Sequence, residues 1–179
     1  MDEGERYVEV GVFTGYTLLA AGYGNKKLVL GIDNFDTEGH DSSVGATIHA
    51  QLIKDRLKRN CEQFKQVSYK VIESDFRNVD LSDFKTGVAY IDGRHDYPSV
   101  IDSLKWLEPS LARDAVLIFD DPDLEGVADA ILDWCHDHKE YELLYMSRSR
   151  DMFHRTPCYD STFSNGVAVA HYKGKNGLQ

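Results

Sequence analysis

Cysteine is scarce in this chain of 179 residues, which has three: Cys61, Cys135 and Cys158. Their spacings match neither a zinc-binding pair nor the two-residue separation of a redox motif, and an odd number does not suit a disulfide framework. We therefore expect no structural zinc and no stabilising disulfides. Free thiols of this kind are typical of a reducing compartment, so we expect a cytoplasmic protein.

Long apolar runs are also lacking. No stretch approaches the roughly 20 apolar residues that a membrane-spanning helix needs. The first residues, MDEGERY, are acidic where a secretory signal would be basic and then apolar. These two absences predict a soluble, unexported protein with no membrane partner.

Basic residues are in the minority, with 20 Lys and Arg against 30 Asp and Glu, a formal charge of −10. The basic residues form no stripe, and each contact with a nucleic-acid phosphate needs a clustered cation. We therefore expect no nucleic-acid partner. A small molecule is the better candidate, and assembly into a homo-oligomer stays open.

Short apolar runs that alternate with helical patterns are what the chain does contain. Apolar side chains make up 42% of the residues, enough for one domain over residues 1–179. Runs typical of strands occupy residues 6–10, 27–32, 69–73, 88–91, 115–119, 141–146 and 166–172. Helical spacing occupies residues 14–23, 46–61, 98–107 and 124–138. The alternation predicts a doubly wound α/β fold with a mostly parallel, seven-stranded sheet.

The last two expected strands differ from the others because only a polar stretch separates them, at residues 147–165. Parallel neighbours need a crossover, usually a helix, whereas antiparallel neighbours do not. We therefore expect an antiparallel edge strand. We also expect this stretch and the loop at residues 36–45 to shape the pocket for the substrate.

The first strand ends in the motif Glu9-x-Gly11-x-x-x-Gly15, which includes Thr14 and leads into a helix. Glycines at such a turn let a ligand approach the backbone and the helix N-terminus. The dinucleotide fingerprint G-x-G-x-x-G is absent, since Phe13 and Tyr16 stand at two of its positions, which weakens a dehydrogenase interpretation. A carboxylate at Glu9 suits the cationic end of S-adenosylmethionine, although the glycines can equally form a plain tight turn.

Two further polar positions follow the next strands. Asp33 closes the second strand, where a doubly wound fold places the acid that accepts ribose hydroxyls. Asp75 and Phe76 follow the third strand and offer an acceptor and an aromatic face to adenine. Each aspartate alone can be a turn or cap residue. Their shared position at the carboxyl ends of three successive strands favours a binding site for the donor.

Three more carboxylates follow the fourth and fifth strands: Asp92, Asp120 and Asp121. Parallel strands lie about 4.8 Å apart, so these charges repel one another unless a proton or a cation intervenes. Oxygen ligands suit Mg²⁺ or another hard divalent cation. His95 lies three residues beyond Asp92 and is a candidate general base. Helix capping by the adjacent aspartates, and a hydrogen bond of His95 within its loop, remain the alternatives.

These motifs resemble those of class I S-adenosylmethionine-dependent methyltransferases, in particular the macrocin-type natural-product sugar O-methyltransferases. The segments that carry the resemblance are VEVGVFTGYT at 8–17, GIDNF at 31–35, YIDGRHDYPSVIDSLKWLEP at 90–109, LIFDDPDLEGV at 117–127 and NGVAVA at 165–170. The D-G-x-H-x-Y block followed by the aspartate pair is the specific part.

The resemblance implies a Rossmann-like fold in which Glu9, Gly11, Asp33 and Asp75 surround the donor. It implies that Asp92, Asp120 and Asp121 bind Mg²⁺ and that His95 removes a proton from the substrate. In the related catechol-type enzymes the last ligand is usually Asn, and Asp121 departs from that.

The sequence therefore predicts metal-assisted O-methylation of a small hydroxylated metabolite. Two alternatives stay open. One is a metal-independent methyltransferase in which Asp92 or His95 acts alone as the base. The other is a donor-binding module without turnover, because members of the family carry helices before the first strand and few residues precede that strand here.

Overall fold

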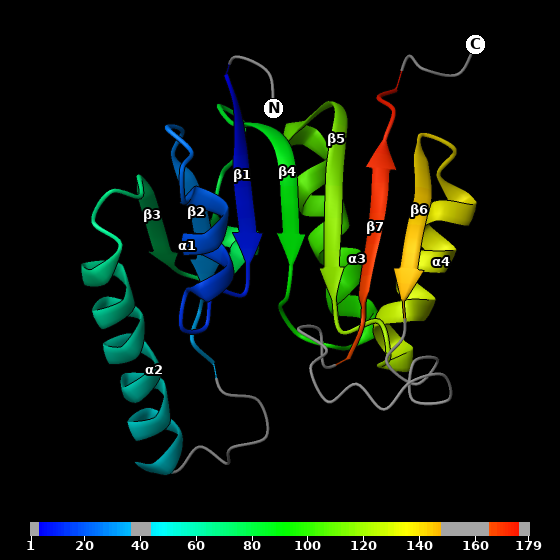
Figure 1. Cartoon of the computed structure of the whole chain (residues 1–179). Helices are drawn as coiled ribbons and strands as arrows, with labels where there is room; N and C mark the ends of the chain where they lie inside the picture. The colour runs from blue at the N-terminus through cyan, green and yellow to red at the C-terminus, as the bar shows by residue number, and fades with distance from the viewer. Residues whose placement is uncertain (1–3, 37–43, 148–164, 176–179) are drawn as a thin grey trace, which may run out of the picture.

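A computed structural model describes residues 4–36, 44–147 and 165–175, which form one sheet flanked by helices (Figure 1). The strands are β1 (Glu5–Val10), β2 (Val29–Asp33), β3 (Tyr69–Glu73), β4 (Lys85–Ile91), β5 (Leu111–Asp120), β6 (Tyr141–Ser147) and β7 (Val167–Tyr172). The helices are α1 (Tyr16–Gly22), α2 (Val44–Gln63), α3 (Tyr97–Leu107) and α4 (Glu125–Asp137), with 3₁₀ turns η1 (Phe76–Asn78) and η2 (Glu108–Ser110). No helix in these ranges is long and apolar enough to cross a membrane.

The strand order across the sheet is β3-β2-β1-β4-β5-β7-β6. Strands β1 to β5 pair in parallel, and β7 runs antiparallel to both β5 and β6. The predicted doubly wound, mostly parallel seven-stranded sheet is thus confirmed. The antiparallel strand, β7, lies second from the edge, and β6 closes the sheet.

The strand order changes direction between β1 and β4. From β1 the chain moves outward to β2 and β3, then returns to β4 on the other side of β1 (Figure 1). Beyond their first residues, the loops after β1 and β4 therefore lead to opposite sides. In open α/β sheets this divergence creates the crevice in which ligands bind.

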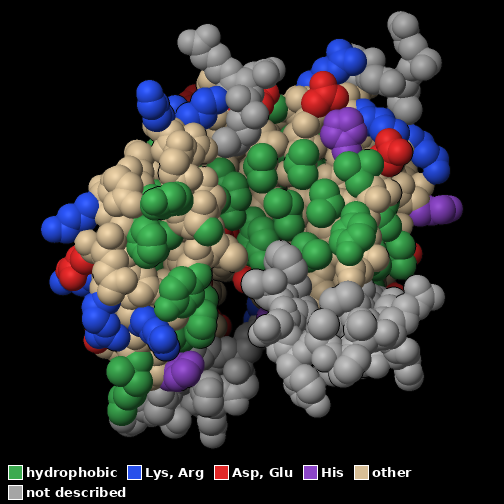
Figure 2. Space-filling view, viewed as in Figure 1, with side chains coloured by type: hydrophobic (Ala, Val, Ile, Leu, Met, Phe, Trp, Pro, Cys, Tyr) green, Lys and Arg blue, Asp and Glu red, His purple; other side chains and the backbone are tan. Residues whose placement is uncertain are grey.

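The two faces of the sheet are packed by different helices. Helices α3 and α4 pack behind the sheet in Figure 1, where Leu104 and Ile131 join the larger core with Val8, Leu117 and Phe119 of the strands. Helices α1 and α2 form a second core on the other face, over β1 to β3. On that face, no described helix covers β5, β7 and β6, and Figure 2 shows apolar side chains gathered there.

Helix α3 begins where the sequence specifies a start. The Asp96 side chain accepts a hydrogen bond from the Ser99 amide at 2.9 Å, and Pro98 stands in the first turn, where a missing amide hydrogen costs nothing. Val100, Leu104 and Leu107 then recur on the buried side. The same start sets the length of the loop between Ile91 and α3, which contributes to the site.

Candidate active site

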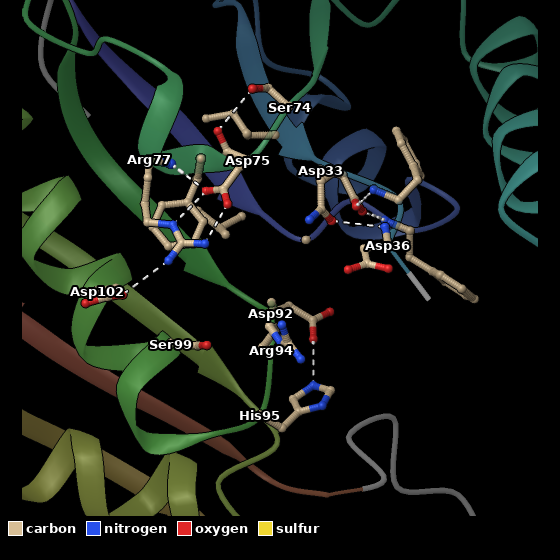
Figure 3. A pocket seen from close by; sticks show the side chains of 18 of the residues that line it. Asp33, Asp36, Ser74, Asp75, Arg77, Asp92, Arg94, His95, Ser99 and Asp102 are labelled. Carbon is tan, nitrogen blue, oxygen red and sulfur yellow. Dashed lines mark hydrogen bonds and ion pairs between the residues drawn. The ribbon is translucent and has the colours of Figure 1, made fainter. Parts of the chain in front are cut away.

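A cavity of about 410 Å³ lies at the carboxyl ends of the first four strands (Figure 3). Each of the four strand ends contributes to its wall: Gly11 after β1, Asp33 as the last residue of β2, Asp75 after β3 and Asp92 after β4. The cavity is of the size that small-molecule sites have, and it mixes apolar walls with a few polar groups. Four positions expected from the sequence therefore share one cavity.

Gly11 brings two of these loops into direct contact. Its φ of +87° is left-handed, and an added Cβ would lie 1.8 Å from the carbonyl oxygen of Asp92. The Asp92 amide donates to the Val10 carbonyl at 2.8 Å, which joins the two loops at the same point. Only glycine fits here, because any Cβ would overlap the backbone of the neighbouring loop.

Asp33 holds the backbone of the first loop. One of its carboxylate oxygens accepts hydrogen bonds from the amides of Val12 and Phe13, both at 2.8 Å, and the other accepts from the Phe35 amide at 2.6 Å. Phe13 and Phe35 both have left-handed backbones, with φ of 47° and 53°. The three charge-assisted hydrogen bonds stabilise conformations that non-glycine residues rarely adopt.

Glu9 lies beneath the cavity and does not line it. The side chain is fully buried between β1 and α1, and its two oxygens accept hydrogen bonds from the hydroxyls of Tyr7 at 2.6 Å and Thr17 at 2.7 Å. Burial raises the pKa of Glu9 to about 7. In the structure this carboxyl therefore supports the loop from behind, whereas the sequence suggested a direct partner for the donor.

Thr14 and Gly15 also lie behind the cavity. The Thr14 carbonyl accepts a hydrogen bond from the Asn60 side chain at 2.8 Å, which ties the loop to α2. Gly15 has a φ of +80°, and an added Cβ would lie 2.4 Å from a methyl group of Leu57. These two residues fix the turn into α1 and set how closely α2 packs against it.

Asp75 and Phe76 line the far end of the cavity. The Asp75 carboxylate accepts from the Arg77 amide at 3.0 Å and from the Arg77 guanidinium at 2.9 and 2.6 Å. These hydrogen bonds hold the pKa of Asp75 below its usual value. The Phe76 ring packs edge-on against Trp106, with 5.4 Å between ring centroids. The sequence analysis missed Arg77, whose only signal was its place two residues after Asp75.

Three ionisable side chains meet beside the cavity: Asp92, His95 and Asp121. The Nε2 of His95 lies 3.1 Å from an oxygen of Asp121 and 3.8 Å from one of Asp92. One potential ligand atom from each lies within 4.8 Å of the other two. Burial raises the pKa of Asp92 to about 6, and the charges of Asp120 and Asp121 add to the increase.

Asp120 lies outside this group, although the sequence suggested it as a ligand. Its side chain accepts hydrogen bonds from the Asp121 amide at 3.1 Å and from the hydroxyl of the buried Tyr90. Burial raises its pKa, since the charged form is less well solvated there. Asp120 is the last residue of β5, so its orientation follows the strand, whereas Asp121, with a φ of 57°, has left it. The group of ligand atoms thus contains His95 in place of Asp120.

The two stretches of chain that the sequence assigned to the substrate pocket lie mostly outside the described residues. This applies to residues 37–43 and 148–164, which make up most of the two stretches expected to shape it. Within the described ranges, His95 and Arg94 line the same cavity as Asp33 and Asp75. The ionisable group is therefore continuous with this cavity.

Comparison with other proteins indicates a family and a fold. Residues 8–122, more than half of the chain, match a family model described as a methyltransferase domain. No curated protein sequence matches the chain. All three structures described below are 16% identical or less, so they indicate the fold alone.

Three solved structures have a similar fold. The O-methyltransferase NovP has a TM-score of 0.63 and 16% identity, with 95% of this chain and 72% of that chain covered. TomG of Streptomyces achromogenes, an O-methyltransferase of tomaymycin synthesis solved with SAM, has a TM-score of 0.65 and 10% identity over 95% and 74%. An rRNA methylase of Streptococcus thermophilus has a TM-score of 0.61 and 10% identity over 97% and 90%.

Proposed function

The chain belongs to the methyltransferase-domain family, and from this premise we propose that it transfers a methyl group from S-adenosylmethionine to a hydroxyl oxygen of a small metabolite, assisted by a divalent cation. One observation carries the proposal. Asp92, His95 and Asp121 bring their ligand atoms within 4.8 Å of one another beside a cavity that Asp33 and Asp75 also line. Donor-binding residues and proton-accepting residues are thus adjacent.

The lining of the cavity suits the proposed donor. Gly11 leaves the backbone accessible, Ile32 and Phe76 give apolar walls, and Asp33 and Asp75 offer carboxylates at the two positions where ribose and adenine would be recognised. Structural neighbours that were solved with SAM or SAH support the same donor. In this proposal Glu9 contributes from behind, by holding the loop between Val10 and Gly15 against α1.

The group formed by Asp92, His95 and Asp121 also fits a divalent cation. Two carboxylates and one imidazole are ordinary ligands, and the shared site relieves the repulsion between Asp92 and Asp121. A cation bound there would lower the pKa of a substrate hydroxyl. We also propose Asp120 as a ligand. Its side chain would have to rotate away from Tyr90 to reach the other three.

The side chains of this group divide the remaining tasks. Where the carboxylates alone hold the cation, the His95 imidazole can accept a proton, and Asp121, with an oxygen 3.1 Å from Nε2, stabilises the imidazolium that results. Asp92 is joined to the loop after β1 through its amide and the Val10 carbonyl, so its backbone is fixed relative to that loop. Orientation and proton removal are therefore what this chain supplies.

Two finer assignments belong to the same proposal. The D-G-x-H-x-Y block and the aspartate pair support the macrocin-type subgroup of natural-product O-methyltransferases, and the structural neighbours NovP and TomG are O-methyltransferases. A cytoplasmic location is proposed from the cysteine content.

The test combines binding with turnover. Calorimetry with S-adenosylhomocysteine should show binding to the protein, and the affinity should fall at least about tenfold in Asp33→Ala, because three backbone amides lose their acceptor. Methyl transfer to a panel of phenols and sugars should stop in excess EDTA and return with Mg²⁺ or Mn²⁺. Donor binding with no transfer to any member of the panel would favour a binding module instead.

A metal-independent reaction is the second candidate, and the distance of 3.1 Å between His95 and Asp121 favours it. An imidazole that is oriented by a carboxylate can act as a base without a cation. Full activity in EDTA would establish this alternative. If Asp121→Asn lost the ability to bind a cation, the result would argue against this alternative. The control is Asp129→Asn, on the exposed side of α4, which should bind the cation as before.

A further inference from the structure

Arg77 connects two elements at the far end of the cavity. It belongs to η1, and its guanidinium contacts Asp75 at 2.9 and 2.6 Å and Asp102 of α3 at 3.6 Å (Figure 3). All three residues line the cavity. The Arg77 guanidinium also lies over the Phe76 ring, 5.6 Å from its centre. The arginine is thus held on three sides.

These contacts leave Asp75 little acceptor capacity. A carboxylate has about four lone-pair positions, two on each oxygen. One oxygen of Asp75 accepts from both the amide and the Nε of Arg77, so its positions are filled. The other oxygen accepts a single hydrogen bond from the guanidinium. One acceptor position therefore remains on the carboxylate.

The paired carboxylate cannot easily turn or become a donor. The two parallel hydrogen bonds fix its plane, since a guanidinium presents its donors in a rigid fork. Arg77 stays charged at every working pH, and it holds the pKa of Asp75 below the usual range. Asp75 is therefore an acceptor in a fixed orientation.

We propose that Arg77 is a positioning residue that makes the cavity select a 6-aminopurine over a 6-oxopurine in the donor. The proposal rests on the proposed function, because it takes the occupant of this end to be the purine of the donor. A 6-amino group donates a hydrogen bond to the remaining acceptor position of Asp75. A 6-oxo group faces the same position with its own lone pairs, and the fixed carboxylate has no way to turn aside.

The role depends on the fork of the guanidinium as well as on its charge. A lysine at this position would keep the charge but could not form two parallel hydrogen bonds to one carboxylate. The Asp75 carboxylate would then be free to rotate, and a water molecule could donate a hydrogen bond to the 6-oxo group. Arg77→Lys is therefore expected to lose selectivity, as Arg77→Met does, although it keeps the positive charge.

The experiment measures the affinities of S-adenosylhomocysteine and S-inosylhomocysteine by calorimetry. We expect the unaltered protein to prefer the adenosyl compound by on the order of tenfold or more, because the 6-oxo compound would cover the acceptor of Asp75 without giving it a donor. Arg77→Met and Arg77→Lys should each bring the ratio of dissociation constants close to one. The matched control is Arg113→Met, which removes another exposed arginine with an aspartate neighbour, at the opposite end of the sheet.

Because the readout is a ratio, a general loss of stability does not imitate the expected result. An unchanged ratio in both Arg77 variants would overturn the inference, and so would equal binding of the two compounds by the unaltered protein. In either case binding of S-adenosylhomocysteine would leave the proposed function standing. If the unaltered protein bound neither compound, the proposed function itself would fail.

Discussion

The Nε2 of His95 lies 3.1 Å from a carboxylate oxygen of Asp121, although Asp121 follows 26 positions later in the chain. The carboxyl ends of β4 and β5 bring them together, because these strands are parallel neighbours. The pair is close enough for Asp121 to orient the imidazole and to stabilise its protonated form.

Substitution of His95 should therefore affect turnover more than binding. In His95→Gln we expect kcat to fall on the order of 100-fold or more, because a positioned base is lost. The affinity for S-adenosylhomocysteine should stay within about twofold of the original, which calorimetry can measure. A variant that binds the donor normally and turns over at the original rate would remove His95 from the reaction.

Gly11 offers a test of the contact between the two loops. In Gly11→Ala the new Cβ would overlap the Asp92 carbonyl, at 1.8 Å, so we expect a loss of stability and of donor affinity. Gly24→Ala is a matched control, since Gly24 also has a positive φ, +73°, but nothing lies within 4 Å of its added Cβ. The control carries the backbone strain without the overlap.

Thermal melting should separate the two effects. We expect both glycine variants to melt at lower temperature, and Gly11→Ala to lose at least about 2 kcal/mol more than Gly24→Ala. Equal losses in the two proteins would mean that the loops after β1 and β4 move apart readily and that their contact contributes little.

The buried carboxyl of Glu9 should make stability depend on pH. Its pKa rises on folding from the ordinary 4.5 to about 7, chiefly through burial. Between these values the folded protein binds more protons than the unfolded chain, so the free energy of unfolding falls as the pH rises. Asp92 acts in the same direction, with a pKa of about 6.

A comparison with Glu9→Gln isolates the contribution of Glu9. Urea unfolding at several pH values from about 5 to about 8 gives the difference in free energy of unfolding between the two proteins. We expect this difference to change in favour of the variant as the pH rises, by up to about 1.4 kcal/mol per pH unit. Most of the contribution of Asp92 cancels, because both proteins contain it. A difference that stays constant would show that Glu9 keeps its ordinary pKa.

The fold was largely predictable because the apolar patterns are long and local. All seven strands and four helices form where the patterns placed them, but β4 and β5 begin earlier than expected. Lys85 and Asp114 explain the difference. They are exposed, charged residues near the starts of these strands, so the apolar pattern begins only after them.

The site was predictable only in part, because side-chain direction depends on distant partners. The sequence placed Asp92, Asp120 and Asp121 at one edge, but it could not indicate that Tyr90 draws Asp120 away while His95 approaches Asp121. Arg77 was missed for a related reason. Its second partner, Asp102, lies on a helix 25 residues further along the chain.

The three amides bound to Asp33 bear on how tightly a ligand can be held. Val12, Phe13 and Phe35 are kept in place by hydrogen bonds within the protein. The loss of conformational entropy in these loops therefore occurs during folding, and the entering ligand does not have to order them. The cavity is preorganised on this side, so its affinity is set by desolvation and direct contacts rather than by the freezing of a loose loop.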